Sequence, residues 1–352
     1  MRQVIKIAIA ATAAFALAAC STPTTPAAPA ASGSSAPASS AAAALKVGMA
    51  YDVGGRGDQS FNDSAATGLD KASAEFGVET KEASATNGEA ESARAERLQQ
   101  LIDAGYTNIV AVGYAYAGAV GTIAKENPEV KFSIVDDASE ASTGANIMNI
   151  TFAENEGSFL VGAAAALKSK TANIGFIGGV NTDLIKKFEA GYAAGAKAVK
   201  PAIKIQVKYL TQPPDYSGFN SVDKGKAAAE GMYQGGADIV YHAAGGSGGG
   251  VFTAAKAAGK LAIGVDSDQA LTAAADVRSV VMTSMIKRVD TGVYTFIKSI
   301  HDGSFKAGNT AFDLKADGVG YSTTGGMVDD IADKLETYKA DIISGKIVVP
   351  AK

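Results

Sequence analysis

The sequence predicts an α/β protein made of two lobes, each a doubly wound, largely parallel sheet with helices on both faces. From residue 46 onward, short apolar segments alternate with segments of helical periodicity. Several apolar segments are continuous, as expected for strands that helices cover on both sides. The alternation runs over 46–152 and starts again over 173–266, which indicates two lobes built on one plan.

The first run begins with a strand that leads into a glycine-rich loop. Helices are predicted where apolar residues recur every 3.6 residues, and Gly105 and Pro128 mark the ends of two of them. The predicted strands are 46–51, 78–82, 108–113, 130–136 and 146–152, and the predicted helices are 64–76, 89–104 and 117–126.

The second run follows a nearly all-apolar helix predicted over 157–167, which must be buried. We expect some later elements to cross back, so that each lobe consists of separate stretches of chain. The predicted strands are 173–178, 203–210, 238–243, 261–266, 279–284, 310–314 and 319–322, and the predicted helices are 183–199, 222–233, 251–258, 287–300 and 328–344.

The N-terminal segment is predicted to be a bacterial lipoprotein signal over residues 1–19. Arg2 and Lys6 precede an apolar stretch over 7–17, and small residues then lead to Cys20. Cys20 is the only cysteine, and this placement predicts that it carries the lipid. An uncleaved membrane anchor is the alternative, but the apolar stretch is short for a bilayer.

Residues 21–44 contain only Ala, Ser, Thr, Pro and Gly, so they cannot form a core. With Cys20 they predict a disordered tether that holds the folded body outside the cytoplasm, at the surface of the bacterial cell membrane. The pattern does not distinguish a Gram-positive from a Gram-negative envelope.

Composition argues against several classes of function. The first 44 residues hold two basic and no acidic side chains, so the net charge of −4 becomes −6 for the remainder, which disfavours nucleic acid as a partner. The two histidines, His242 and His301, lie far apart, and the paired aspartates near residues 136 and 266 lack further ligands at metal-binding spacing. No metal and no cofactor are expected.

The loop over 51–62 is a candidate ligand site because ligands of open α/β sheets bind beyond the carboxyl ends of the strands. Its glycines permit close approach, Asp52 and Asn62 offer polar groups, and Phe61 offers a flat ring. This mixture suits a small polar molecule with an apolar face. An ordinary strand-to-helix turn is the alternative. The role of Asp58 stays open between ligand contact and support of the loop.

The loop over 245–249 permits an enzymatic alternative. Ser247 stands in a G-x-S-x-G pattern, and Asp266 and His301 follow in the order of an α/β hydrolase. The other interpretation is a close-approach turn whose backbone N–H groups face a ligand. If two lobes face each other, Phe61 and Tyr241 could sandwich a flat ligand; core packing is the alternative for each ring.

Two charged residues of the second half also have two interpretations. Asp266 ends an apolar strand, where it either caps the next helix or binds ligand hydroxyl groups. Lys287 stands at the predicted start of a helix, where basic residues are disfavoured, so an acidic or polar site is favoured over a solvated face.

Taken in order, these motifs resemble the basic membrane protein (BMP) family of ABC-transporter substrate-binding lipoproteins, which includes the purine nucleoside receptor PnrA. The resemblance covers nearly all of residues 46–345. The matching motifs are Asp52-x-Gly54-Gly55-x-x-Asp58-x-Ser60-Phe61-Asn62, Gly113-Tyr114, Glu156-x-x-Phe159-Leu160-x-Gly162, Phe188-x-x-Gly191-Tyr192-x-x-Gly195, Gly236-Ala237-Asp238, Ala244-Gly245-Gly246-x-Gly248, Gly264-Val265-Asp266-x-Asp268-Gln269 and Thr283-Ser284-x-x-Lys287.

The resemblance implies a type I periplasmic-binding fold, with lobes of 45–150 plus 285–312 and 151–284 plus 313–352 joined by a hinge of crossing strands. It implies a monomeric binding protein without enzymatic activity, whose partners are a nucleoside ligand and the permease and ATPase subunits of an importer. The implied ligand contacts are stacking by Phe61 and Tyr241, hydrogen bonds between the ligand's polar groups and Asp52 and Asn62, ribose binding by Asp266 and Lys287, backbone contact at Gly245 and Gly246, and further cleft contacts at Tyr114 and Asp136.

Overall fold

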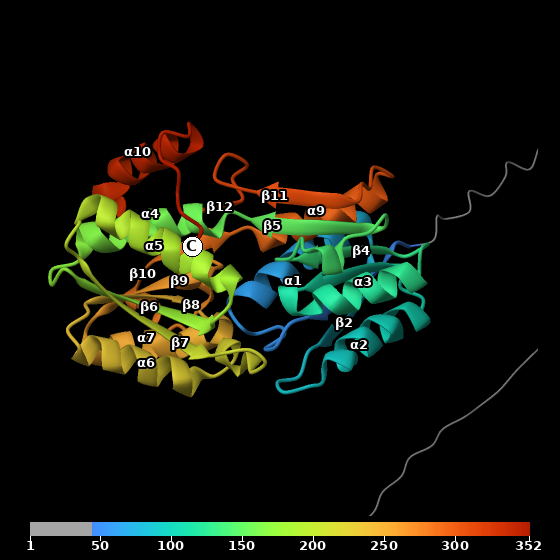
Figure 1. The fold of residues 1–352 in the computed structure, drawn as a ribbon, viewed down its shortest axis with the longest axis horizontal. Coiled ribbons are helices and arrows are strands. Elements are labelled where there is room, and N and C mark those ends of the chain that lie inside the picture. The colour runs from blue at the N-terminus through green and yellow to red at the C-terminus, as the bar shows by residue number, and fades with distance from the viewer. Residues whose placement is uncertain (1–43) are drawn as a thin grey trace, which may run out of the picture. The chain divides into compact units, whose positions relative to one another are not determined.

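The computed structural model describes residues 44–352 (Figure 1), so the predicted signal segment, Cys20 and nearly all of the tether lie outside the described residues. Two six-stranded sheets form, in the orders β11-β5-β4-β3-β1-β2 and β12-β10-β9-β8-β6-β7. All pairings are parallel except β10 with β12. The predicted two-lobe α/β architecture is confirmed.

The first lobe contains the sheet that begins the described chain. Its elements are β1 (Lys46–Tyr51), α1 (Phe61–Phe76), β2 (Glu79–Ser84), α2 (Glu91–Asp103), β3 (Asn108–Val112), α3 (Ala117–Glu126), β4 (Lys131–Val135), β5 (Ile147–Phe152), α9 (Val289–His301) and β11 (Gly308–Phe312).

The second lobe contains the other sheet and five longer helices. Its elements are α4 (Glu154–Lys168), β6 (Asn173–Val180), α5 (Asp183–Val199), β7 (Lys204–Thr211), α6 (Val222–Gln234), β8 (Ile239–Ala243), α7 (Gly248–Ala258), β9 (Leu261–Asp266), the short α8 (Gln269–Thr272), β10 (Val281–Lys287), β12 (Val319–Tyr321) and α10 (Ala332–Ile343).

The chain crosses between the lobes three times: after β5, after β10 and after β11. Both lobes are therefore built from separate stretches, as expected. β5 runs to Phe152 and β10 to Lys287, so the crossings after them fall slightly later than the predicted boundaries at 150 and 284. One apolar cluster joins the lobes here, since it contains Phe152 of β5 together with Phe159 of α4 and Val319 of β12.

Helix α1 begins at Phe61, earlier than the predicted residue 64. The reason is Asp58, whose carboxylate accepts hydrogen bonds from the backbone N–H groups of Ser60, Asn62 and Asp63. These groups have no partner within a helix, so the carboxylate extends the helix by satisfying them. Phe61 and Asn62 thus lie in the first helical turn rather than in a loop.

The placement of Lys287 at the start of a helix was wrong. Lys287 is the last residue of β10, where it pairs with Val319 of β12 and follows the apolar Met285 and Ile286. The sheet continues through these residues because β9 and β12 both pair with them. Helix α9 starts only at Val289.

Helices α4 and α5 pack against each other unusually closely (Figure 1). A Cβ atom on Gly195 would lie 1.9 Å from the carbonyl oxygen of Phe159, and one on Gly162 would lie 2.1 Å from that of Tyr192. Only glycine permits this approach, which fixes the position of α5 and of Phe188 on it. None of the helices within residues 44–352 is long and apolar enough to cross a membrane.

Candidate functional site

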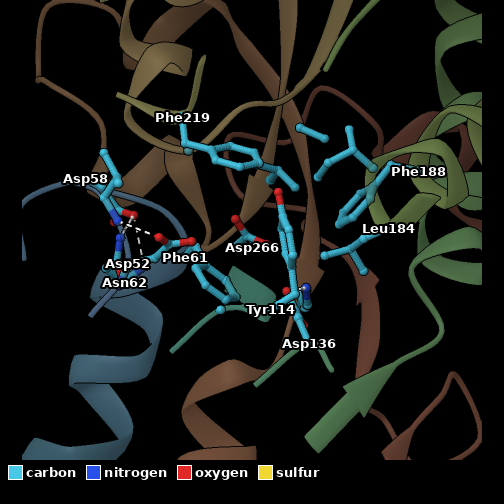
Figure 2. A pocket seen from close by; sticks show the side chains of 17 residues that line it. Asp52, Asp58, Phe61, Asn62, Tyr114, Asp136, Leu184, Phe188, Phe219 and Asp266 are labelled. Atoms are coloured by element: carbon cyan, nitrogen blue, oxygen red, sulfur yellow. Dashed lines mark hydrogen bonds and ion pairs between the residues drawn. The ribbon is translucent and has the colours of Figure 1, made fainter. Parts of the chain in front are cut away.

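A cavity lies between the lobes (Figure 2), beyond the carboxyl ends of strands from both sheets. The lining residues are Asp52, Val53, Asp58, Phe61, Asn62, Gly113, Tyr114, Asp136, Leu184, Ile185, Phe188, Phe219, Ala243, Gly245, Val265, Asp266 and Lys287.

Most of the residues proposed from the sequence meet at this cavity. Gly246 is not among the lining residues, and neither is Tyr241. The eight that line it are Asp52, Phe61, Asn62, Tyr114, Asp136, Gly245, Asp266 and Lys287.

The structure places Tyr241 in the core of the second lobe, away from the cavity. Its side chain is fully buried, its ring lies 5.1 Å from that of Tyr192, and its hydroxyl group is 3.1 Å from Ser158 Oγ. Tyr241 is in the middle of β8, which ends at Ala243, so its side chain belongs to the layer between sheet and helices. The structure therefore does not place its ring where it could stack on a ligand.

Sequence reasoning missed the aromatic residues that the second lobe does contribute. Phe188 of α5 and Phe219, in a short 3₁₀ segment before α6, point into the cavity opposite Phe61 of the first lobe (Figure 2). Phe188 stood in one of the family motifs but was not assigned a role. The signal that could have found it is its place in the second turn of the helix after β6, close to that strand's carboxyl end.

Among residues 44–352, Lys287 is the one cationic residue that lines the cavity, and only 2% of its surface is exposed. Its Nζ lies 2.6 Å from Asp136 Oδ2 and 3.4 Å from Glu154 Oε1. It also lies 5.1 Å from the ring centre of Phe61. Burial lowers the pKa of Lys287, but the carboxylates of Asp136, Glu154 and Asp266 raise it by more. The ammonium group therefore stays charged.

Asp136, directly after β4, and Asp266, the last residue of β9, lie in the left-handed backbone region, with φ of 71° and 64°. This conformation costs free energy for residues other than glycine and is typical of functional sites. Asp266 Oδ2 accepts a hydrogen bond of 2.7 Å from Ser60 Oγ, and Asp136 Oδ1 has no partner among the described residues. Burial, opposed by Lys287, raises the pKa of Asp136 to about 6 and that of Asp266 to about 7.

The first lobe contributes two further carboxylates with different roles. Asp52 Oδ1 accepts the backbone N–H of Val53, Arg94 lies 4.0 Å behind it, and burial raises the pKa of Asp52 to about 6. Asp58 also lines the cavity, but three backbone N–H groups and the amide of Asn62 occupy its oxygens. Support of the loop accounts for its hydrogen bonds.

Asn62 is held on both sides of its amide group. Its Oδ1 accepts the N–H of Asp52 at 3.1 Å, and its Nδ2 donates to Asp58 at 3.0 Å, which leaves one amide hydrogen for a ligand. The hydroxyl group of Tyr114 is buried and has no partner among the described residues. With four carboxylates and one ammonium group, the cavity suits a ligand that offers hydroxyl or N–H donors and carries no negative charge.

The whole of this two-lobed body matches a known family. Residues 45–352 match the family described as "ABC transporter substrate-binding protein PnrA-like". The chain belongs to this PnrA-like family of substrate-binding proteins.

Two relatives align in sequence with most of this chain, and a solved structure resembles it over a similar share. The "ABC transporter nucleoside-binding protein BmpA" of Lactococcus lactis subsp. cremoris is 37% identical over 88% of this chain and 90% of that protein. "Basic membrane protein A" of Borreliella burgdorferi is 33% identical, with 84% of each chain covered. Among solved structures, a solute-binding protein of an ABC transporter system from Aeropyrum pernix K1 has a TM-score of 0.76 and 28% identity, covering 88% of this chain and 94% of that one.

Neither membership of the PnrA-like family nor the geometry of the chain supports the hydrolase alternative. Ser247 is fully buried, and its Oγ donates to the carbonyl oxygen of Gly218 and accepts the N–H of Ser221. His301 is exposed at the end of α9 in the other lobe, where it stacks on Phe76. Ser247, Asp266 and His301 therefore form no triad. Within residues 44–352, no cluster of three His, Cys, Asp or Glu side chains could hold a metal ion.

Proposed function

We propose that this protein captures a purine nucleoside between its lobes and delivers it to the permease of an ABC importer. The observation that carries the proposal is the pairing, in one cavity, of aromatic rings from both lobes with the buried Asp136, Asp266 and Lys287. A nucleoside has the matching parts: a flat base and a ribose with hydroxyl groups. Binding followed by lobe closure is the mechanism, with no chemical step.

The arrangement of the aromatic rings supports a position for the base between the lobes. Phe61 from the first lobe and Phe188 and Phe219 from the second approach the same space (Figure 2). Stacking between a base and an aromatic side chain contributes about 1–3 kcal/mol. Asp52, which follows β1, is hydrogen-bonded through its N–H to Asn62, which lies in the first turn of α1. The carboxylate of Asp52 and the free amide hydrogen of Asn62 would meet polar groups on the base edge.

The ribose would lie toward the charged residues. Ionised Asp266 and the free Oδ1 of Asp136 accept hydroxyl hydrogens, and the ammonium group of Lys287 donates to hydroxyl oxygens. Burial makes these groups costly to leave without partners, so a ligand that satisfies them is favoured over one that does not. The nucleoside-binding name of the Lactococcus relative supports the same ligand class.

We also propose that the mature chain is lipidated at Cys20, so that 20–44 tether the body at the outer side of the cell membrane. The support is the signal pattern of residues 1–19 and the family of substrate-binding proteins to which the body belongs. Palmitate labelling of cells that express the parent chain, with Cys20→Ser as control, tests this anchor. Equal labelling of both chains would refute it.

A calorimetric screen of nucleosides, free bases and sugars with the purified chain tests the ligand. We expect purine nucleosides to bind, free bases to bind more weakly because they lack the ribose, and sugars not to bind. If sugars bound and no nucleoside did, the ligand assignment would be wrong. A search for hydrolysis of nucleosides in the same samples, which we expect to be negative, tests the absence of a chemical step.

A further inference from the structure

The two lobes also contact each other outside the cavity, through one short segment of each. Two donors of the second lobe meet the carbonyl oxygen of Gln59: Gln269 Nε2 at 2.9 Å and Thr272 Oγ1 at 3.1 Å. Next to it, the carbonyl oxygen of Ser60 accepts a hydrogen bond from Ser267 Oγ at 2.9 Å. These residues are more than 200 positions apart in the chain. We call this set of contacts the clasp.

The first-lobe side of the clasp is rigid before the second lobe meets it. Gln59 has a positive φ of 57°, which a residue other than glycine keeps only when its surroundings enforce it. Its N–H donates to Asp63 Oδ2, and the neighbouring Ser60 N–H donates to Asp58. The carbonyl groups of Gln59 and Ser60 are thereby held toward the second lobe.

The second-lobe side is fixed in the same way. Gln269 is 1% exposed, its Oε1 accepts the N–H of Val265, and its own N–H donates to Ser284 Oγ. One side chain thus connects the end of β9, which carries Asp266, to the first loop of the other lobe. Neither Gln269 nor Thr272 lines the cavity.

We propose that the clasp stabilises the closed cleft without contacting the ligand, and that Gln269 and Thr272 are positioning residues that slow ligand release. The proposal rests on the nucleoside-binding function proposed above. Both clasp surfaces are preorganised, so their hydrogen bonds form when the lobes approach and add to the free energy of closure. The unliganded protein should then populate the closed form as well.

The test compares Thr272→Val with Thr253→Val. Thr272 is exposed and isosteric with Val, so the change removes only the bond to Gln59. Thr253 is an exposed threonine of the same lobe whose hydroxyl group bonds within its own helix to Gly249, which makes it the matched control. In stopped-flow displacement of a bound purine nucleoside, we expect release to be roughly fivefold faster for Thr272→Val and unchanged for Thr253→Val. Equal release from parent and Thr272→Val would overturn the proposal.

A second variant tests the central residue. Gln269→Met removes both side-chain hydrogen bonds of Gln269, and Ser284→Ala removes support of the same residue without touching the first lobe. We expect both to lower the melting temperature, but only Gln269→Met to accelerate release by more than Thr272→Val does. If release of the nucleoside accelerated in both variants in proportion to the fall in melting temperature, Gln269 would have a structural role alone. That result would refute the proposal.

A measurement of the distance between the lobes tests the clasp without a ligand. Spin labels on Lys81→Cys of the first lobe and Lys224→Cys of the second, in the full chain with Cys20→Ser, report lobe separation. We expect a shift toward longer distances for unliganded Gln269→Met, and an unchanged distribution would refute the clasp. If the parent bound no nucleoside but the distances shifted, the proposed ligand would be wrong and the clasp would stand.

Discussion

Lys287 Nζ lies 2.6 Å from Asp136 Oδ2, although Lys287 ends β10, Asp136 follows β4, and these two strands belong to different sheets. The pair is buried and bridges the lobes across the cavity. Glu154, the first residue of α4, lies 3.4 Å from the same ammonium group, and α4 packs with the second lobe. Opening of the cleft would separate Asp136 from Lys287 but leave Glu154 in place.

Glu154→Gln therefore removes the carboxylate that would remain beside Lys287 when the cleft is open, and it should destabilise the open form. Removing one partner of a buried ion pair costs about 3–5 kcal/mol, and the remaining Asp136 should reduce the loss in the closed form. We expect a lower melting temperature. Because the open form loses more stabilisation than the closed form, we expect nucleoside affinity to rise, by up to about tenfold. Calorimetry checks the affinity. Glu230→Gln, which affects an exposed pair with Lys226, is the control and should behave as the parent.

Asp266→Asn should weaken nucleoside binding about 100-fold while the chain stays folded. The change removes the charge that strengthens hydrogen bonds to hydroxyl groups, and it turns one acceptor into a donor. The control is Asp276→Asn, an exposed partner of Lys256 in the same lobe. Affinity equal to that of the parent would remove Asp266 from the ligand site.

Stability and affinity should depend on pH with opposite signs. The pKa of Asp266 is raised to about 7 and those of Asp52 and Asp136 to about 6, so between pH 4 and 7 the folded chain holds protons that the unfolded chain has released. The free energy of unfolding of the unliganded chain therefore falls as pH rises through this range. Hydroxyl donors need ionised carboxylates, so affinity for a nucleoside should rise over the same range and level off above about pH 7.

Chemical denaturation and calorimetry at pH 5.5, 6.5 and 7.5 measure the two trends. In Asp266→Asn the rise of affinity between pH 6.5 and 7.5 should be lost. Affinity that falls with increasing pH in the parent would show that the ligand binds the protonated carboxyl groups instead.

Phe188→Ala should reduce nucleoside affinity by about 5- to 150-fold, the equivalent of 1–3 kcal/mol for a lost stacking contact. Tyr241→Phe should leave affinity within about twofold, because that side chain is buried away from the cavity and loses only its contact with Ser158. The reverse pattern in calorimetric titrations would place Tyr241, and not Phe188, against the base.

A nucleoside 5′-monophosphate should bind at least about 100-fold more weakly than the nucleoside. The cavity holds four carboxylates, and its one lining cation, Lys287, is already paired with Asp136. A phosphate group would lose its hydration without gaining a free cation. Competition of the monophosphate against a bound nucleoside measures the ratio, and equal affinities would contradict this account of the charges.

Residues that follow strands were the part of the site that the sequence predicted well. Asp52, Asp136 and Asp266 were found because the carboxyl ends of neighbouring parallel strands meet at one edge. Phe188 was not found, because its approach to the cavity depends on how closely α5 packs on α4. Tyr241 was misplaced because one position along a strand decides between core and edge, and a pattern of apolar residues does not fix that position.

Element boundaries failed where a specific side-chain contact or strand pairing decides them. Asp58 starts α1 early through hydrogen bonds to Ser60, Asn62 and Asp63, and a propensity argument does not reveal this side-chain conformation. Lys287 belongs to β10 because β12, more than 30 residues later, pairs with it. Only in the second case does a partner distant in sequence set the end of the element.

The late crossings of the chain also govern the order in which the protein can fold during synthesis. The first sheet receives its edge strand β11 only after residue 308, and α1 lies uncovered until α9 arrives. A nascent chain that has reached β10 thus exposes β5 as an unpaired edge, together with apolar surface that α9 later covers. The two lobes therefore cannot fold one after the other during synthesis. Both complete their folding only when the last fifth of the protein has been made.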